Sequence, residues 1–234
     1  MASTSEVTFG ARIANAEALS TNLKGFVGYV APTTETSIVN YDVLIASMKT
    51  ENSSVATKKL AYSVAVDVRQ KHFEKEPTSI GKILSPIVAA VRAKMGRTSK
   101  ELAEITALMT KIRGEKPKKP KEGDTPETVS QSERSYGSMT QNFSDIVTTL
   151  TALGANYSVV KVNLKLPALL TKVADVTAAN NAVTTTYGSL KTTVDSRANK
   201  YDDLGERTQR IKEAVKSQYG VGSTEYKLIK GLKV

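Results

Sequence analysis

The chain contains an internal repeat, because one long helical pattern recurs after 128 residues. Residues 38–73 align with residues 166–201 without a gap. In both segments apolar residues follow one another at alternating spacings of three and four, the pattern of a helix that packs along one stripe. Polar residues interrupt this apolar seam at matching places: Asn52 aligns with Asn180, and Arg69 with Arg197. We therefore expect an all-α protein built from two similar halves.

Two further alignments extend the repeat on both sides of the long segment. A shift of 124 aligns residues 80–105 with residues 204–229, and it matches Gly96 with Gly220. A shift of 127 aligns the first helix with its counterpart and matches Asn15 with Asn142. The change of shift places four extra residues in the first copy near Pro77. The chain is thus predicted to be a tandem duplication of an antiparallel helical bundle, with three to four helices per repeat and one long helix in each.

Helix boundaries follow from capping and breaking residues. In the first copy we predict helices over residues 5–30, 37–74, about 80–95 and about 98–112. Gly96 should end the third helix, and Thr98 with Glu101 should form a capping box for the fourth. Pro86 either begins the third helix or kinks it. In the second copy the long helix can run directly into the next one, since residues 202–218 contain no proline.

One segment of the second copy resembles a strand. Residues 157–166 alternate between apolar and polar side chains, but their counterpart, residues 29–38, contains Pro32 and several threonines. A single strand would have no partner with which to form a sheet. We therefore interpret the segment as a loop that leads to a helix starting near Pro167.

A charged, proline-rich stretch at 114–134 divides the chain. It lacks apolar periodicity and contains three prolines, a composition typical of an extended linker. The sequence thus predicts one helical repeat over 1–113, a linker over 114–134 and a second repeat over 135–234.

The formal net charge of +10 is shared equally between the two repeats, and the linker is neutral overall. Basic residues spread in this way favour weak association with polyanions, or they are ordinary solvated helix faces. Four lysines of the linker, Lys116, Lys118, Lys119 and Lys121, are the candidate polyanion contacts. Acidic residues follow them immediately, which cancels their charge at short range and favours a solubilising linker over a nucleic-acid-binding arm.

The sequence contains few of the residues from which active sites are built. There is no cysteine, so disulfides, thiolate catalysis and sulfur-based zinc sites are excluded. The lone histidine, His72, aligns with Lys200 and is expected to be solvated. No phosphate-binding glycine loop and no zinc-protease motif is present. We therefore expect no enzyme activity and no catalytic, cofactor-binding or metal-binding residue, and hence no cofactor.

The four polar residues of the seam, Asn52, Asn180, Arg69 and Arg197, are the most specific candidates. A buried asparagine can fix the register of packed helices at a cost in stability. A buried arginine needs an anionic or carbonyl partner, because an unpaired charge there is very costly. Register and pairing between helices are the favoured interpretation, and a ligand site is the alternative.

Three parts of the sequence also carry a family resemblance. Together with the duplicated helical body, they resemble a family of bacterial two-repeat helical proteins with no assigned activity. These parts are the opening MASTSEV, the linker KPKKPKEGDTPETVSQSERSYGSM and the closing GVGSTEYKLIKGLKV. The resemblance covers most of the chain. It implies a soluble intracellular protein and supplies no site residues.

These observations lead to one main functional hypothesis. We expect a non-catalytic interaction or scaffolding protein that binds a protein partner or self-assembles through its helices. The alternative is a basic nucleic-acid-associated protein that contacts phosphates non-specifically; a peripheral membrane or pore-forming protein ranks third. No signal peptide and no run of 18 apolar residues is visible, so no transmembrane segment is expected and a cytoplasmic location is the default.

Overall fold

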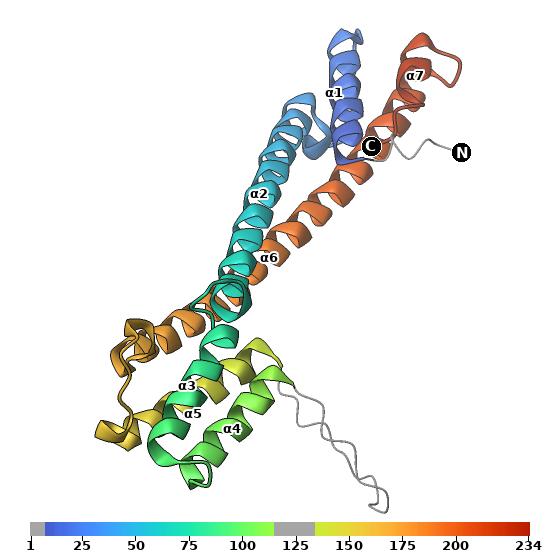
Figure 1. The fold of residues 1–234 in the computed structure, drawn as a ribbon. Helices are drawn as coiled ribbons and strands as arrows, with labels where there is room; N and C mark the ends of the chain where they lie inside the picture. The colour runs from blue at the N-terminus through green and yellow to red at the C-terminus, as the bar shows by residue number, and fades with distance from the viewer. Residues whose placement is uncertain (1–7, 115–133) are drawn as a thin grey trace, which may run out of the picture. The chain divides into compact units, whose positions relative to one another are not determined.

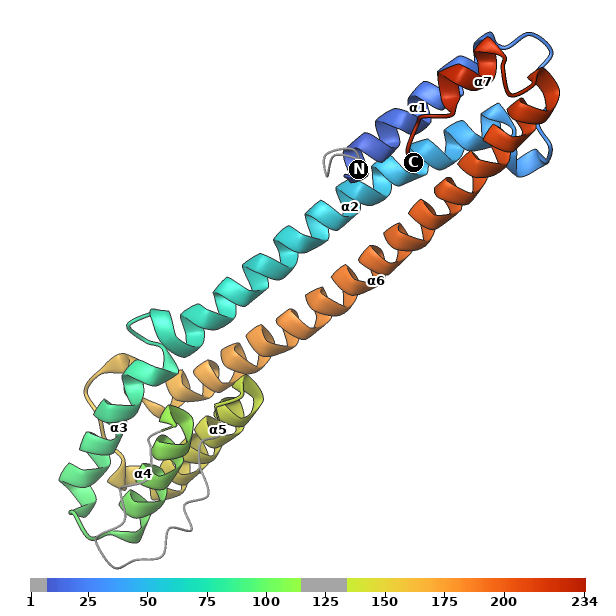
Figure 2. The same ribbon diagram turned by 90° about the vertical axis from the view of Figure 1, so that its right-hand side faces the viewer.

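The structure is a computed structural model and describes residues 8–114 and 134–234. Within these ranges the chain is helical and has no strand, which confirms the all-α class (Figures 1 and 2). None of the helices in these ranges is long and apolar enough to cross a lipid bilayer. The elements in chain order are α1 (Phe9–Gly25), η2 (Thr34–Thr36), α2 (Ile38–Gln70), η3 (Lys71–Lys75), α3 (Ile80–Met95), α4 (Lys100–Arg113), α5 (Tyr136–Leu153), η4 (Gly154–Asn156), η5 (Val162–Leu164), α6 (Leu166–Tyr219) and α7 (Thr224–Ile229).

Most predicted boundaries agree with these elements. The predicted long helix of the first copy is α2, which ends in a π-helical turn, η3. In the second copy α6 runs without a break to Tyr219, as the lack of proline allowed. Pro86 lies inside α3, so it does not begin that helix. Three predictions were wrong by a few residues. The first helix, α1, begins at Phe9 and not Ser5 and ends at Gly25 and not Val30, and the cap of α4 is Ser99 and not Thr98.

Aligned residues begin and end aligned helices. Gly96 ends α3 at a φ of 84° and Gly220 follows α6 at a φ of 92°, a region of backbone conformation that favours glycine. The hydroxyl of Ser99 then accepts a hydrogen bond from the backbone N–H of Leu102. The aligned Ser223 caps α7 in the same way, by accepting from the N–H of Tyr226. Each serine satisfies a backbone donor that a helix start leaves free.

The chain packs into two compact units that do not follow the two halves of the sequence. Unit 1 comprises residues 1–61 and 187–234, and unit 2 comprises residues 62–186. Each unit therefore takes helices from both predicted repeats, whereas the sequence predicted separate bundles over 1–113 and 135–234. The physical reason lies in the two long helices, because the apolar seams of α2 and α6 each extend through residues of both units.

Unit 1 has an aliphatic core with one buried tyrosine on each long helix. Side chains of α1, α2, α6 and α7 form this core. Tyr41 and Tyr201 are its largest members, and both are almost completely buried. The remaining buried members of the core are Ile13, Ala16, Leu19, Leu23, Leu44, Ile45, Met48, Leu204, Ile211, Val215 and Ile229.

Unit 2 has a larger apolar core. It is built from η3, α3, α4, α5, the segment that contains η5, and the beginning of α6. Phe73, Ile87, Ile105, Phe143 and Leu169 are among its most buried side chains. At the junction of η3 and α3 the backbones approach closely: a Cβ atom at Gly81 would lie 3.3 Å from the backbone oxygen of Phe73.

The two cores differ at one pair of aligned positions. In unit 1 the hydroxyls of Tyr41 and Thr208 form a buried hydrogen bond of 2.6 Å. The aligned positions in unit 2 are Leu169 and Leu84, both of which are fully buried. A polar pair in unit 1 thus takes the place of an apolar pair in unit 2.

The Tyr41–Thr208 pair yields a stability prediction. Tyr41→Phe leaves the Thr208 hydroxyl without its partner, and we expect it to lower the free energy of unfolding by about 1–2 kcal/mol. Adding Thr208→Val removes both polar groups, so the double variant should regain most of this loss. Urea unfolding of the wild type, both single variants and the double variant measures the coupling. Additive effects of the two substitutions would contradict the coupling.

High pH tests the burial of the same tyrosine. Burial raises the pKa of Tyr41 to about 12, above the 10.0 of an exposed tyrosine. The unfolded chain therefore loses this proton first, and stability falls as the pH rises from 10 towards 12. At pH 11 the loss from this group is about 1.4 kcal/mol. Tyr41→Phe should lose less stability than the wild type between pH 9 and pH 11, as measured by urea unfolding. An equal decline in both proteins would contradict the prediction.

Candidate functional site

The polar seam residues of unit 2 lie together. The Arg69 guanidinium of α2 stacks over the Tyr136 ring of α5, 3.9 Å from its centroid. Its Nη1 donates to Oδ1 of Asn180 on α6 at 3.3 Å. The Phe73 ring packs edge-on against Tyr136, with 4.9 Å between the centroids. Arg69 and Asn180 thus connect the two long helices, and an aromatic ring from a shorter helix covers the charge.

The seam residues of unit 1 occupy aligned places but bond differently. The Arg197 guanidinium of α6 stacks over the Phe9 ring of α1, 4.2 Å from its centroid. Phe9 aligns with Tyr136 at the shift of 127. Among the described residues, Asn52 does not bond to Arg197; its amide nitrogen instead donates to the Tyr201 hydroxyl at 2.9 Å. That hydroxyl donates in turn to the backbone oxygen of Phe9 at 2.9 Å.

Two seam atoms are buried without a hydrogen-bond partner among the residues that the structure describes. They are Oδ1 of Asn52 in unit 1 and Nε of Arg69 in unit 2. Leaving a buried polar atom unpaired costs about 1–3 kcal/mol. Arg69 has the carbonyl partner that a buried arginine was expected to need, the amide oxygen of Asn180. Arg197 stacks on a ring and has no such partner among the described residues.

A second arginine of unit 1, Arg12, was not anticipated. It lies over the Tyr201 ring, 4.6 Å from the centroid, and its Nη2 donates to the Tyr201 backbone oxygen at 3.0 Å. The Phe9 and Tyr201 rings contact each other, with centroids 4.7 Å apart. Sequence reasoning missed Arg12 because it lies on the first helix and does not interrupt the seam. The alignment of Arg12 with an apolar residue, Met139, was the available signal.

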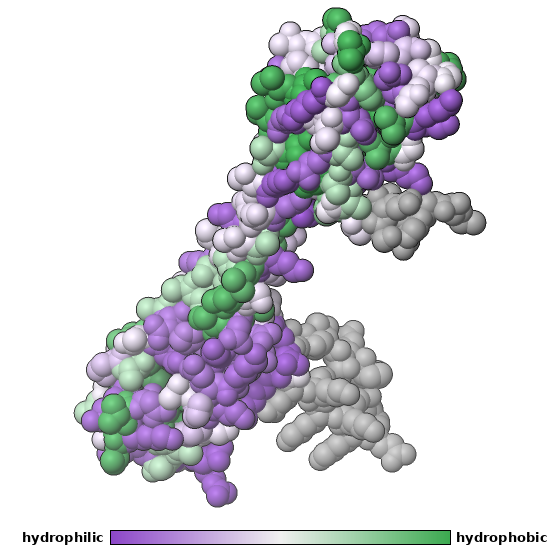
Figure 3. Space-filling view, turned by 90° about the horizontal axis from the view of Figure 1, so that it is seen from above, coloured by the Kyte–Doolittle hydropathy of each residue, from purple (hydrophilic) through white to green (hydrophobic). Residues whose placement is uncertain are grey.

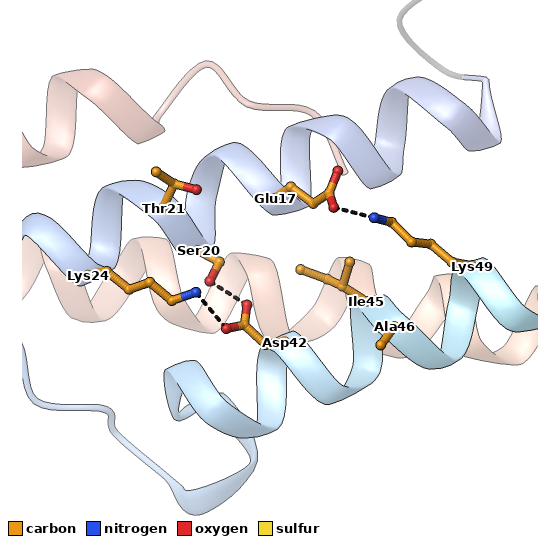
Figure 4. Close-up of a pocket in the computed structure, with 8 residues that line it drawn as sticks. All are labelled: Glu17, Ser20, Thr21, Lys24, Asp42, Ile45, Ala46 and Lys49. Atoms are coloured by element: carbon orange, nitrogen blue, oxygen red, sulfur yellow. Dashed lines mark hydrogen bonds and ion pairs between the residues drawn. The ribbon is translucent and has the colours of Figure 1, made fainter.

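A polar groove of about 290 Å³ lies between α1 and α2 of unit 1 (Figure 4). Ser20 and Lys24 of α1 converge on Asp42 of α2: the serine hydroxyl donates to Oδ1, and the lysine Nζ lies 2.7 Å from Oδ2. One helical turn away, Glu17 pairs with Lys49. Both charged pairs connect α1 to α2.

The Ser20–Asp42–Lys24 group resembles the catalytic residues of a hydrolase, but its charged groups are not arranged to activate a serine nucleophile. The hydrogen bonds from Lys24 and then from Ser20 hold the pKa of the Asp42 carboxyl below its ordinary value. A carboxylate with a lowered pKa is a weaker base, and it already accepts the serine proton as a hydrogen bond. The lysine is the carboxylate's ion-pair partner rather than a free base. The arrangement therefore suits clamping of two helices better than activation of Ser20.

The remaining candidates are placed as follows. His72 is half-buried in unit 2, where its Nδ1 lies 3.3 Å from Nζ of Lys172. It is therefore less exposed than predicted. The candidate polyanion contacts Lys116, Lys118, Lys119 and Lys121 lie outside the described residues. Within the described ranges no three His, Cys, Asp or Glu side chains are grouped so that they could hold a metal ion.

Comparisons of the chain with protein-family models, curated proteins and solved structures give no match. The resemblance to bacterial two-repeat proteins therefore stays a prediction, and function has to be argued from the chain itself.

The Arg69 cluster yields a prediction. Arg69→Met removes the ring contact and leaves Oδ1 of Asn180 without its donor, so we expect a loss of about 1–3 kcal/mol in unfolding free energy. Arg69→Lys keeps the charge but loses the flat contact, so its loss should be intermediate. Arg97→Met at an exposed position serves as the control and should stay within about 0.5 kcal/mol of the wild type. If Arg69→Met matches this control in urea unfolding, the cluster does not stabilise unit 2.

Proposed function

We propose that this protein is a non-catalytic helical interaction protein that self-associates through the solvent-facing side of α2 in unit 1. The observation that carries the proposal is a helix face that is exposed, partly apolar and free of charge. It lies outside the packed core, and of its members only Ala46 also lines the groove that holds the charged pairs described above.

The face, here named the α2 outer face, consists of seven residues at alternating spacings of four and three. All seven are exposed and none is charged. They lie on the opposite side of the helix from the buried Tyr41, Ile45 and Met48. The members are Val39, Val43, Ala46, Thr50, Ser53, Thr57 and Leu60.

A helix that faces only water ordinarily carries charged or strongly polar residues on its outer side. Here the aliphatic side chains Val39, Val43 and Leu60 are 72%, 62% and 67% exposed. Apolar residues are also visible among polar ones over the molecular surface (Figure 3). The average spacing of 3.5 residues is the repeat by which one helix packs along another. A helix is therefore the partner that this face fits best.

A second copy of the same chain supplies such a helix. In an antiparallel pair centred on Thr50, Val39 of one copy faces Leu60 of the other, and Ala46 faces Ser53. Apolar residues then meet at both ends, and small residues meet in the middle, where they let the helices approach closely. A two-fold symmetric interface requires this kind of self-complementary series.

We also infer that the chain arose by tandem duplication of one helical unit. In support, the caps at Ser99 and Ser223, the glycines at Gly96 and Gly220, and the ring contacts of Arg69 and Arg197 recur at shifts of 124 to 128. Duplication accounts for similar cores in both units even though each unit takes helices from both copies. The competing function, non-specific nucleic-acid binding, is favoured only by the net positive charge, which is spread over both predicted repeats.

Charge placed on the α2 outer face tests self-association. Thr50→Glu puts two carboxylates against each other in the proposed pair, and Thr50→Lys puts two ammonium groups there. Each variant alone should be monomeric in sedimentation equilibrium at concentrations up to about 100 μM, where we expect the wild type to form dimers. An equimolar mixture of the two variants should dimerise again, because the opposite charges attract.

A matched control is Thr148→Glu on α5. Thr50 and Thr148 are both exposed, and each hydroxyl donates to the backbone oxygen four residues before it. We expect Thr148→Glu to dimerise like the wild type. Two results would refute the proposal. One is a wild-type chain that stays monomeric over this concentration range, and the other is a mixture of the Glu and Lys variants that fails to associate.

A further inference from the structure

A small pocket of about 180 Å³ lies in unit 1 where the first turn of α1 meets α6. Arg12 and Arg197 both line it, together with Tyr201 and Phe9, on whose rings their guanidinium groups stack. Val194 and Ala198 contribute an apolar part of the lining, and Asp202 contributes a carboxylate. The pocket thus combines two cations, a hydrocarbon surface and one acid.

Arg197 is the unusual member of this group. It is half-buried and has an aromatic ring against one face of its guanidinium. Within the described part of the chain its N–H groups have no hydrogen-bond acceptor and no ion-pair partner, although a guanidinium has five N–H donors. Arg12 uses Nη2 on the Tyr201 backbone oxygen. The pocket therefore holds several N–H donors that have no acceptor in the part of the chain that the structure describes.

Comparison with unit 2 shows that packing alone does not require this arrangement. There the aligned arginine, Arg69, has the amide oxygen of Asn180 as its acceptor. The position aligned with Arg12 is Met139, a buried apolar residue. A unit of this kind is thus built with one arginine and an apolar neighbour, and the second cation occurs only in unit 1.

The chemistry of the lining indicates the class of ligand. A flat guanidinium matches the two oxygens of a carboxylate or a phosphate. The Asp202 carboxylate repels anions, and this repulsion grows with the ligand's charge, so a singly charged carboxylate is favoured over a doubly charged phosphate. The Val194 and Ala198 side chains and the Phe9 ring suit an apolar portion of the ligand.

We propose that unit 1 binds a small organic carboxylate with an apolar body, whose carboxylate is held between Arg12 and Arg197. This binding is independent of self-association through α2, because none of the pocket residues belongs to the α2 outer face.

Isothermal titration of the full-length protein with benzoate tests the proposal, with inorganic phosphate as the comparison. We expect saturable benzoate binding below about 10 mM and weaker phosphate binding. Arg197→Gln and Arg12→Met, the latter introducing the residue of unit 2, should each weaken benzoate binding about tenfold or more. Arg69→Gln makes the equivalent change in unit 2 and should leave the dissociation constant within about twofold.

Asp202→Asn keeps the test decisive if an arginine variant fails to fold, since Asp202 is exposed. Removing its charge should tighten phosphate binding more than benzoate binding, by about threefold or more. Each of three results would overturn the proposal. They are a lack of saturation by benzoate, phosphate binding to the wild type as tight as benzoate binding, and an effect of Arg69→Gln as large as that of Arg197→Gln.

Discussion

Each compact unit depends on how a long helix accommodates an arginine within an otherwise apolar seam. Burying a guanidinium without partners is costly, yet both α2 and α6 place one between helices. The solution in both units is an aromatic ring from a shorter helix, Tyr136 for Arg69 and Phe9 for Arg197. The stacked ring desolvates the face of the guanidinium and leaves its N–H edge available for a hydrogen bond. The shorter helices α5 and α1 are thereby held against the long ones.

The sequence predicts the helices well because their signals are local. The spacing of apolar residues shows which face of α2 is buried, and glycine and proline show where helices end or continue, as at Gly96 and along α6. The polar seam residues were found for the same reason, since each interrupts a regular series. The wrong prediction of the α4 cap also has a local cause. Thr98 and Ser99 are chemically similar neighbours, and only the backbone geometry distinguishes them.

What could not be predicted is which helix covers which face. An apolar seam shows that a helix face is buried but not which helix buries it. The sequence therefore could not predict that units 1 and 2 would each take helices from both predicted repeats. The pocket at Arg12 and Arg197 has the same origin: its residues come from segments more than 180 positions apart in the chain. The groove at Ser20 and Asp42 likewise joins two helices whose contact the sequence does not specify.

The differences between the units carry more functional information than their similarities. Features that both units have, such as the serine caps and the stacked arginines, are explained by stability alone, since each satisfies a group that folding would otherwise leave exposed or unpaired. Arg12 takes the place of a methionine, although its contact with the Tyr201 ring and its hydrogen bond to the Tyr201 backbone oxygen also stabilise unit 1. It adds a second positive charge beside Arg197, and further N–H donors with it. The aligned position in unit 2 shows that an apolar side chain can pack at this place. A ligand that accepts hydrogen bonds from both guanidinium groups would offset the repulsion between these two charges.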